Sequence, residues 1–335
     1  MTITSFDLDA LQAGFQLNTP LGTMLVRSRC ETHSGLVVLF DEFALKFRKP
    51  LDLGFLDYST TERRWEALST EFKLGRQLSA EVYLGVWGVR GCVATLDSEM
   101  SAEPVLVMKR LAKSARMDVL IADADVGFDV ISPALVALAS FHGKTAVDRR
   151  VDGWGSTANT LHAWEVNFSE MTIGADYIPF SPMEYEDLRR STDCWFQANR
   201  GVFEARITEG RIRDCHGDLR PEHIYLVDPV AFIDPLEFST ALRFADVGAE
   251  IGYLAMECDM LGRSNLSEEI VGQYIEMAQD TSLATVVGFF KRYRALVMAK
   301  VEWIRARQLD GPERTVHNKR ARRYAELALG YKLEQ

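Results

Sequence analysis

The stretch DCHGDLRPEHIYLVDPVAFIDPLEF, residues 214–238, decides the fold of this chain. It contains two short apolar runs, HIYLV and AFID, on either side of an Asp-Pro pair at 228–229. Apolar and β-branched residues that flank such a turn signal are typical of two strands joined by a tight turn. The pattern therefore predicts a β-hairpin whose centre lies near Pro229.

Three chemically active side chains are expected at the open end of this hairpin. A centre near Pro229 sets Ile224 opposite Asp234, so that Asp234 comes beside His223. Asp218 lies in the loop that leads into the same end. Such a cluster can hold a hard divalent cation on oxygen ligands and leave one carboxylate to orient a hydroxyl nucleophile.

The N-terminal part of the chain has the pattern of a sheet. Residues 23–50 contain the segments TMLVRSRC, LVVLF and FALKF, which are rich in apolar and β-branched side chains and have hairpin spacing. They predict an antiparallel sheet. In FALKF, alternation places Phe43, Leu45 and Phe47 on one face and Lys46 on the other, so Lys46 is expected to point away from its apolar neighbours.

A helix is predicted after these strands. Ser59 followed by Glu62 has the spacing of a capping box, and apolar residues recur at helical intervals up to Leu78. Glu71 lies near the edge of the apolar stripe, where a carboxylate normally needs a partner. The helix is expected to pack on the sheet, which continues with strands at VYLGVWGV and PVLVMKRL.

Beyond residue 112 the periodicity becomes mainly helical. The order of sheet first and helices later predicts an α+β protein of two lobes joined near residues 107–112. We expect an N-terminal lobe over residues 1–110 and a C-terminal lobe over 111–335. The predicted helices cover ISPALVALASF and residues 183–207, 247–261, 267–279 and 283–308.

Composition places the chain among ordinary folded proteins. Its 335 residues are 47% hydrophobic and 26% charged, which excludes disorder and disulfide scaffolds. A net charge of -10 disfavours nucleic acid and anionic membranes as partners. The five cysteines are scattered and never spaced as CxxC, and the N-terminus has no signal-like segment. We therefore expect a cytoplasmic protein without membrane-spanning segments.

The sequence resembles the aminoglycoside phosphotransferase and choline kinase group within the protein-kinase-like fold, and most of all bacterial proteins of the aminoglycoside phosphotransferase family. The motif of that group is HGD, an Asn a few residues later, a strand hairpin, and an ID before an acidic or aromatic residue. Here it stands as His216-Gly217-Asp218, His223 and Ile233-Asp234, followed by Glu237-Phe238. The resemblance covers nearly the whole chain and includes ETHSG at 31–35, ALKFRKP at 44–50, GFLDYSTTERR at 54–64, EVYLGV at 81–86 and RYRALVMAKV at 292–301.

The resemblance implies a bilobal protein-kinase-like fold and a magnesium-dependent phosphoryl transfer from ATP or GTP. It gives Asp218 the role of catalytic base and Asp234 that of magnesium ligand. Lys46 would contact the nucleotide phosphates, and Glu71 would pair with Lys46. His216 belongs to the same catalytic loop, where it is expected to brace the loop rather than to react.

The resemblance also implies two groups of nucleotide-binding residues. A loop between the first two strands would cover the phosphates with hydroxyls and backbone amides in place of a glycine-rich loop. Its residues are Thr32, His33 and Ser34. The residues that would face the adenine are Val107, Met108 and Lys109.

His223 departs from the family pattern, which has Asn as the second metal ligand. An imidazole is a softer ligand and suits magnesium less well. His223 is therefore open to three roles: metal ligand, donor to a phosphate, or brace for Asp218. Many relatives continue into a further domain with a GxxxxGK[ST] loop, which we do not expect in this chain.

The acceptor is expected to be a hydroxyl of a small molecule, whose identity the sequence does not give. Glu250, Glu257 and Asp259 would suit a cationic acceptor such as an amino sugar, or they form a solvated or internally paired helix face. Two alternatives remain to phosphoryl transfer. They are a catalytically weak or inactive nucleotide-binding regulator, and nucleotidyl transfer with the same metals.

Overall fold

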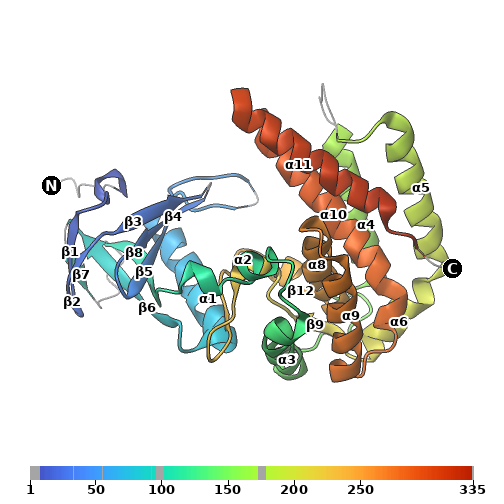
Figure 1. Ribbon diagram of the computed structural model, residues 1–335, viewed down its shortest axis with the longest axis horizontal. Coiled ribbons are helices and arrows are strands. Elements are labelled where there is room, and N and C mark those ends of the chain that lie inside the picture. The colour runs from blue at the N-terminus through green and yellow to red at the C-terminus, as the bar shows by residue number, and fades with distance from the viewer. Residues whose placement is uncertain are drawn as a thin grey trace. The chain divides into compact units, whose positions relative to one another are not determined.

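The computed structural model describes residues 8–32, 34–54, 56–91, 93–95, 102–172 and 179–333. The chain divides into two compact units. The first consists of residues 1–115 and 227–239, and the second of residues 116–226 and 240–335. One unit is built on a sheet and the other is mainly helical, which confirms the predicted α+β class (Figure 1).

The first unit combines a sheet with one long helix. The elements described in its N-terminal portion are η1 (Leu8–Ala10), β1 (Gln16–Thr19), β2 (Gly22–Leu25), β3 (Ser28–Glu31), β4 (Gly35–Leu39), β5 (Phe43–Arg48), α1 (Thr61–Ser79), β6 (Tyr83–Arg90), β7 (Val93–Thr95), β8 (Glu103–Lys109) and η2 (Lys113–Ala115). The strands form one sheet in the order β2-β1-β7-β6-β8-β5-β4-β3. Neighbouring strands are antiparallel except β1 and β7, which are parallel.

The sheet is curled. Strands β2 and β3 lie at opposite ends of the sheet order, yet only Val26 and Arg27 separate them along the chain. Val26 N–H donates to Phe15, and Arg27 N–H donates to Leu39, so the chain changes partner strand here. The single strand predicted at TMLVRSRC is therefore two strands. The concave face encloses an apolar core that includes Leu45.

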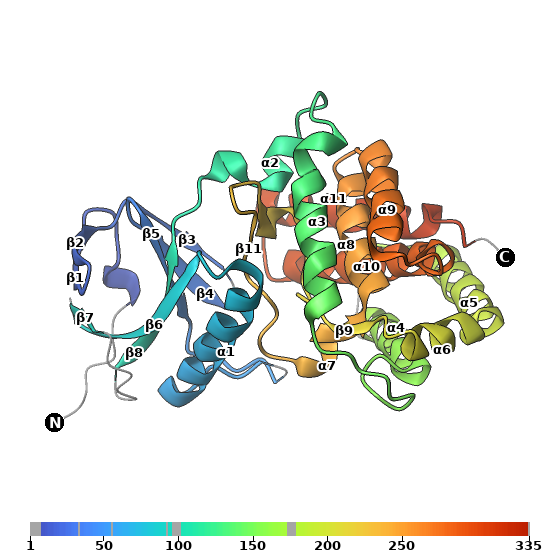
Figure 2. The same ribbon diagram turned by 90° about the horizontal axis from the view of Figure 1, so that it is seen from below.

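Helix α1 packs against β6 and β8 on the other face of the sheet (Figure 2). Its N-cap is Thr60, one residue later than predicted, and the Thr60 side chain accepts from Arg63 N–H, while the Ser59 hydroxyl donates to Asp57 at 2.6 Å. A glycine is required at position 75, where a Cβ would lie 2.3 Å from the Tyr83 ring. This close approach fixes α1 to β6.

Residues 227–239 group with the first unit, whereas the sequence pattern predicts them in the C-terminal lobe. Hydrogen bonds explain this grouping, since Phe232 N–H donates to Ser79 of α1 at 2.6 Å. The two strands expected in this region are present as β10 (Ile224–Tyr225) and β11 (Ala231–Phe232). Because β10 belongs to the second unit and β11 to the first, the predicted register between them stays a prediction.

The second unit is dominated by helices. Helix α8 is apolar on nearly all sides and almost every one of its residues is buried, as expected for the central helix of a bundle. Helices α9, α10 and α11 pack against it (Figure 2). The elements are α2 (Met117–Ile121), α3 (Phe128–Lys144), α4 (Thr157–Thr172), α5 (Pro182–Ala198), α6 (Arg200–Thr208), β9 (Ile212–Asp214), η3 (Pro221–His223), β10, α7 (Thr240–Arg243), β12 (Phe244–Asp246), α8 (Val247–Met260), α9 (Ser264–Ala278), α10 (Leu283–Arg307) and α11 (Gly311–Gly330).

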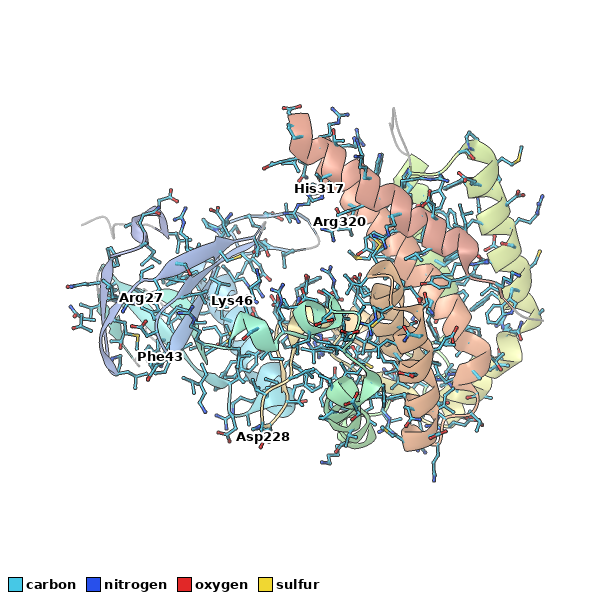
Figure 3. The ribbon with its side chains drawn as sticks, viewed as in Figure 1. Arg27, Phe43, Lys46, Asp228, His317 and Arg320 are labelled. Atoms are coloured by element: carbon cyan, nitrogen blue, oxygen red, sulfur yellow. The ribbon has the colours of Figure 1, made fainter. Side chains whose placement is uncertain are left out.

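Contacts between helices α10 and α11 are apolar and ionic. Tyr324 of α11 is fully buried in the core of this unit. His317 and Arg320 of α11 both contact Glu302 of α10, at 2.5 and 3.2 Å (Figure 3).

The helix predicted over residues 183–207 is interrupted at Asn199, which lies between α5 and α6. Of the helices in the described ranges, none combines the length and the hydropathy needed to cross a bilayer.

The Asp148 carboxylate predicts a pH-dependent stability. It accepts hydrogen bonds from Arg150 Nε at 2.8 Å and from Trp154 N–H at 3.2 Å. The bond from Arg150 is the main cause that lowers the pKa of Asp148 to about 2, against opposing burial. Between about pH 4 and pH 2 the unfolded chain therefore binds a proton that the folded chain does not, so stability falls as the pH is lowered through this window.

We expect this loss to be about 1 kcal/mol, because Arg150 is exposed and water screens the pair. Urea unfolding of the wild type and of Asp148→Asn at several pH values measures it. The free-energy difference between the two proteins should shrink as the pH falls from about 4 to about 2. A difference that is constant over this range would contradict the assignment.

Candidate functional site

Two cations of β5 share one buried carboxylate of α1. Lys46 Nζ lies 2.7 Å from Glu71 Oε1, and an Arg48 guanidinium nitrogen lies 2.8 Å from Glu71 Oε2. All three side chains are buried, and Glu71 is 0% exposed. The predicted pair between Lys46 and Glu71 is therefore present. Arg48 was missed, although strand alternation places residues 46 and 48 on the same face.

The segment that follows β11 completes this charge cluster. Asp234 Oδ1 accepts from Lys46 Nζ, and Glu237 lies 2.6 Å from Arg48 and also accepts from the Tyr58 hydroxyl. Burial and the nearby Arg48 charge oppose protonation of Lys46, but the carboxylates of Asp234, Glu71 and Glu237 outweigh them and raise the pKa of Lys46. Lys46 is therefore a fixed positive charge.

Asp234 is positioned by its backbone as well as by Lys46. Its N–H donates to the Tyr83 hydroxyl at 2.9 Å, and the close approach of Tyr83 to Gly75 sets where that hydroxyl lies. The residue has a φ of 64°, a left-handed conformation that Asp tolerates better than most side chains. Its side chain is 44% exposed, so the carboxylate is accessible from solvent while Lys46 and Glu71 are not.

The predicted phosphate loop is described in part. Thr32 Oγ1 accepts from Gly35 N–H at 3.0 Å and donates to Gly35 O at 3.2 Å, so its hydroxyl closes the turn between β3 and β4. The Ser34 carbonyl oxygen accepts a hydrogen bond from Lys49 N–H. His33 lies outside the described residues. A role of this loop in binding phosphates stays a prediction.

The three residues expected to face adenine end strand β8. Val107 is opposite Leu45 of β5 and lies in the apolar core of the curled sheet, so its side chain points away from Lys46. Met108 is opposite Ala44 and therefore shares the face of Lys46. The Lys109 side chain is about half exposed. Only Met108 has a side chain on the face where the prediction needs it.

In the second unit, Glu250 of α8 holds the backbone of the HGD loop. Its carboxylate accepts from His216 N–H at 3.1 Å and from Gly217 N–H at 2.8 Å. The ring of His142 lies 2.8 Å from the same carboxylate. Burial opposes ionisation, but these donors outweigh it and lower the pKa of Glu250. Gly217 has a φ of 88°, a conformation that favours glycine at this position of the loop.

The two predicted histidines brace Asp218. His216 is fully buried, and its Nδ1 accepts from Asp218 N–H at 3.3 Å. His223 Nδ1 lies 2.7 Å from the Asp218 carbonyl oxygen, to which it donates. The Asp218 side chain is 39% exposed and thus reaches solvent. Of the roles left open for His223, the brace is the one with a contact in this structure.

Asp234 fits a magnesium ion better than His223 does. A carboxylate supplies the hard oxygen that magnesium prefers, and this one is accessible. The Nδ1 of His223 is occupied by a backbone carbonyl, which leaves a softer nitrogen as its only further donor.

A second, buried group of possible metal ligands is closed by its own hydrogen bonds. His142, Cys215 and Glu250 lie close together, but the two ring nitrogens of His142 bind Tyr274 and Glu250. Burial raises the pKa of the Cys215 thiol well above its usual value, so Cys215 is a poor nucleophile and a poor ligand.

The three acidic residues of α8 are internally paired. Glu250 binds the HGD loop, Glu257 accepts from the Tyr324 hydroxyl at 3.0 Å, and Asp259 binds Lys291 at 2.6 Å and Tyr331 at 2.7 Å. The alternative of an internally paired helix face is therefore the one observed. These carboxylates already bind groups of the protein itself, so they do not offer a free negative charge to a cationic acceptor.

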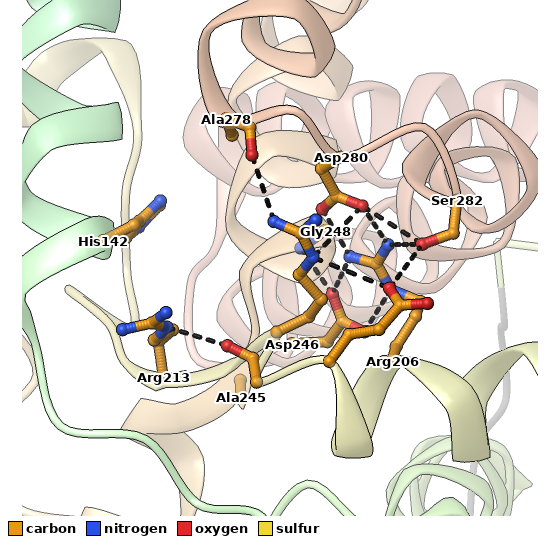
Figure 4. Close-up of polar contacts among 12 residues, drawn as sticks. His142, Arg206, Arg213, Ala245, Asp246, Gly248, Ala278, Asp280 and Ser282 are labelled. Atoms are coloured by element: carbon orange, nitrogen blue, oxygen red, sulfur yellow. Dashed lines mark hydrogen bonds and ion pairs between the residues drawn. The ribbon is translucent and has the colours of Figure 1, made fainter.

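A buried ionic cluster anchors the start of α8. Arg206 donates to both oxygens of Asp246 at 2.7 Å and to Asp280 at 2.6 and 3.0 Å (Figure 4). Asp246 is the N-cap of α8 and accepts from Gly248 N–H at 2.7 Å. Strand β12 also pairs with β9, which leads into the HGD loop. The cluster therefore fixes the helix that carries Glu250.

Comparison with solved structures identifies the fold. The chain matches the GDP complex of aminoglycoside 2'-phosphotransferase-IIIa with a TM-score of 0.56 and 16% identity, over 90% of this chain and 93% of that one. A choline/ethanolamine kinase family protein from Mesorhizobium loti matches with a TM-score of 0.53 and 14% identity, over 90% and 91%. The chain therefore has the protein-kinase-like fold of these small-molecule kinases, as predicted.

The relatives found by sequence are more similar to this chain in sequence than the solved structures are, but their names give no function. Uncharacterized proteins of Mycobacterium tuberculosis and Mycobacterium bovis are 32% identical over 279 residues, which is 83% of this chain and 55% of theirs. The chain thus spans about half the length of these curated relatives. No model of a known protein family matches the sequence.

Proposed function

We propose that this protein is a phosphotransferase that uses ATP or GTP with magnesium to phosphorylate a hydroxyl of a small molecule. The observation that carries the proposal is the buried ion pair of Lys46 with Glu71, together with the contact of Lys46 to Asp234. A cation held rigidly beside an accessible carboxylate suits a nucleotide phosphate and its magnesium ion. Phosphoryl transfer depends mainly on such positioning and charge neutralisation.

Each group has a defined task in this proposal. Asp234 would hold the magnesium ion, which neutralises phosphate charge when it is bound. Lys46 binds phosphate oxygens, and Glu71 keeps Lys46 in place. Asp218 orients the acceptor hydroxyl and takes its proton. As the proton leaves, the hydroxyl oxygen bonds to the γ-phosphorus, and the bond from the γ-phosphorus to the bridging oxygen of the nucleotide breaks. His216 and His223 keep the Asp218 backbone in place.

Two further assignments belong to the proposal. Structural neighbours named for phosphotransfer to aminoglycosides and ethanolamine support a small-molecule acceptor, and we infer the acceptor class below. A cytoplasmic location agrees with Cys30, Cys194, Cys215 and Cys258, which are thiols.

The test is calorimetric titration with a non-hydrolysable ATP or GTP analogue, with and without magnesium. We expect the wild type to bind the analogue only with magnesium. We expect Asp234→Ala to weaken this binding at least about tenfold, because losing a charged ligand of the metal costs more than about 1.4 kcal/mol of binding free energy. Asp228→Asn is the matched control, because Asp228 is an exposed turn residue of the same segment (Figure 3).

Binding of the analogue with equal affinity by wild type and Asp234→Ala would remove Asp234 from the metal site. Failure of the wild type to bind either analogue would overturn the proposed function.

A further inference from the structure

One cation beside the HGD loop has no carboxylate partner. Arg294 of α10 donates to the carbonyl of Gly217, the residue before Asp218, at a long distance of 3.3 Å. Its guanidinium carbon lies 4.6 Å from the centre of the Tyr253 ring, and its Nε is buried without a hydrogen-bond partner. Within the described ranges of the chain, no carboxylate comes within 4.0 Å of Arg294.

The other cations of the same segment, RYRALVMAKV at 292–301, have side-chain partners away from the HGD loop. Lys300 pairs with Glu170 at 2.5 Å. Arg292 donates to the hydroxyls of Ser191 at 3.1 Å and Thr192 at 3.0 Å. Among the described residues Arg292 also has no carboxylate within 4.0 Å, and its Nε is also buried without a hydrogen-bond partner. Arg294 differs from it because Arg294 is the cation of this segment that contacts the HGD loop.

Arg294 belongs to the electrostatic surroundings of Asp218. Burial raises the pKa of the Tyr253 hydroxyl, the Asp218 carboxylate raises it further, and the charges of Arg220 and Arg294 act against both. Asp218, Arg220 and Arg294 therefore each lie within electrostatic reach of the Tyr253 hydroxyl. Arg220 is already bound, since it lies 2.6 Å from Glu222 and 3.8 Å from Glu257.

These contacts favour an anionic acceptor over a cationic one. A positively charged acceptor at Asp218 would meet the uncompensated guanidinium of Arg294, and the carboxylates of α8 that would attract it are bound elsewhere. An oxyanion, in contrast, would supply the partner that Arg294 lacks. Guanidinium binds carboxylate and phosphate through paired hydrogen bonds, and partial burial strengthens such bonds.

We propose that the acceptor carries a carboxylate or phosphate group, and that Arg294 binds this group while Asp218 orients the acceptor hydroxyl. The proposal rests on the proposed function, because it assigns the acceptor of that same reaction. Such an anionic acceptor differs in charge from an amino sugar.

The test uses four compounds on one three-carbon frame: glycerol, aminopropanediol, glycerate and glycerol phosphate. Each is titrated calorimetrically into the full chain, with and without a saturating non-hydrolysable nucleotide and magnesium. We expect glycerate and glycerol phosphate to bind at least about tenfold more tightly than the neutral and cationic compounds. In Arg294→Gln this preference should be lost, and in Arg294→Lys part of it should remain.

Arg307→Gln is the matched control, because Arg307 also lies on α10, at its C-terminal end, and also stacks on an aromatic ring, that of Trp303. Thermal unfolding checks that every variant is folded. Equal binding of the four compounds, absence of binding by both anions, or an anion preference that survives in Arg294→Gln would each overturn the proposal.

Nucleotide affinity separates this inference from the proposed function. It is measured first, in wild type and in each variant. If the nucleotide fails to bind but glycerate or glycerol phosphate binds through Arg294, the proposed function fails and the anion site stands. If Arg294→Gln weakens the nucleotide instead, Arg294 serves the donor phosphates, and the inference about the acceptor is wrong.

Discussion

Replacing Asp218 with Asn should lower the rate of phosphoryl transfer by about a thousandfold, the usual contribution of a positioned general base. The amide cannot take the proton of the acceptor hydroxyl. The main-chain contacts of residue 218 to His216 and His223 do not involve the carboxylate, so the loop should keep its conformation. Nucleotide affinity should therefore stay within about twofold of wild type. Steady-state transfer rates and calorimetry measure the two quantities.

Asp228→Asn provides the matched control for this experiment, since it makes the same chemical change at an exposed turn. It should leave the transfer rate unchanged. An Asp218→Asn protein that transfers phosphate as fast as wild type would take Asp218 out of the mechanism. Loss of nucleotide binding in that variant would show that the residue acts on the donor instead.

Replacing Arg206 with Met should lower the free energy of unfolding by about 3–5 kcal/mol, the cost of leaving buried charges without their partner. Arg206 and Asp280 are 0% exposed and Asp246 is buried, so the two carboxylates would lose their shared cation in a low-dielectric environment. Because Asp246 caps α8, which carries Glu250, the HGD loop should also lose order. Urea unfolding measures the stability change.

A second substitution identifies the cause of this effect. Adding Asp280→Asn to Arg206→Met removes one uncompensated charge and should recover part of the lost stability. Arg200→Met is the matched control, because Arg200 pairs with Glu204 on the surface of the same helix and should cost less than about 1 kcal/mol. A loss of similar size in Arg206→Met and Arg200→Met would contradict the account.

Strongly patterned elements were predictable from the sequence, whereas short polar ones were not. The alternation of Phe43 to Phe47 identified β5, and long apolar periodicity identified α8 and α10. Strand β1 reads Gln-Leu-Asn-Thr and has one buried side chain, so it carries no strand signal of its own. It exists because its neighbours in the curled sheet bind its backbone, which is a tertiary effect.

Local competition explains the errors in element boundaries. Ser59 and Thr60 are adjacent residues that both suit an N-cap, and in the structure Thr60 accepts from Arg63 N–H while Ser59 binds Asp57. Asn199 interrupts a periodic stretch that would otherwise read as a single helix. Neither outcome follows from helical spacing alone.

The candidate site was predictable where a motif or an alternation identified it. Lys46, Glu71, Asp218 and Asp234 follow from such signals. Arg294 and the pair of His142 with Tyr274 were missed, because their partners lie far away in the sequence and only the packed helices bring them together. Arg294 does lie in RYRALVMAKV, a segment that the resemblance had already marked as familiar.

The central claim is the transfer of a phosphoryl group to a small hydroxyl compound, and product mass tests it most directly. Wild type and Asp218→Asn are each incubated with magnesium, a small-metabolite extract, and ATP or GTP whose γ-phosphoryl oxygens are isotopically labelled. The account predicts that wild type forms a product heavier than its acceptor by about 80 daltons plus the mass of the isotopic label, and that the variant forms none, as phosphoryl transfer requires. A gain of a whole nucleotidyl group, or bound nucleotide without any labelled product, would contradict it.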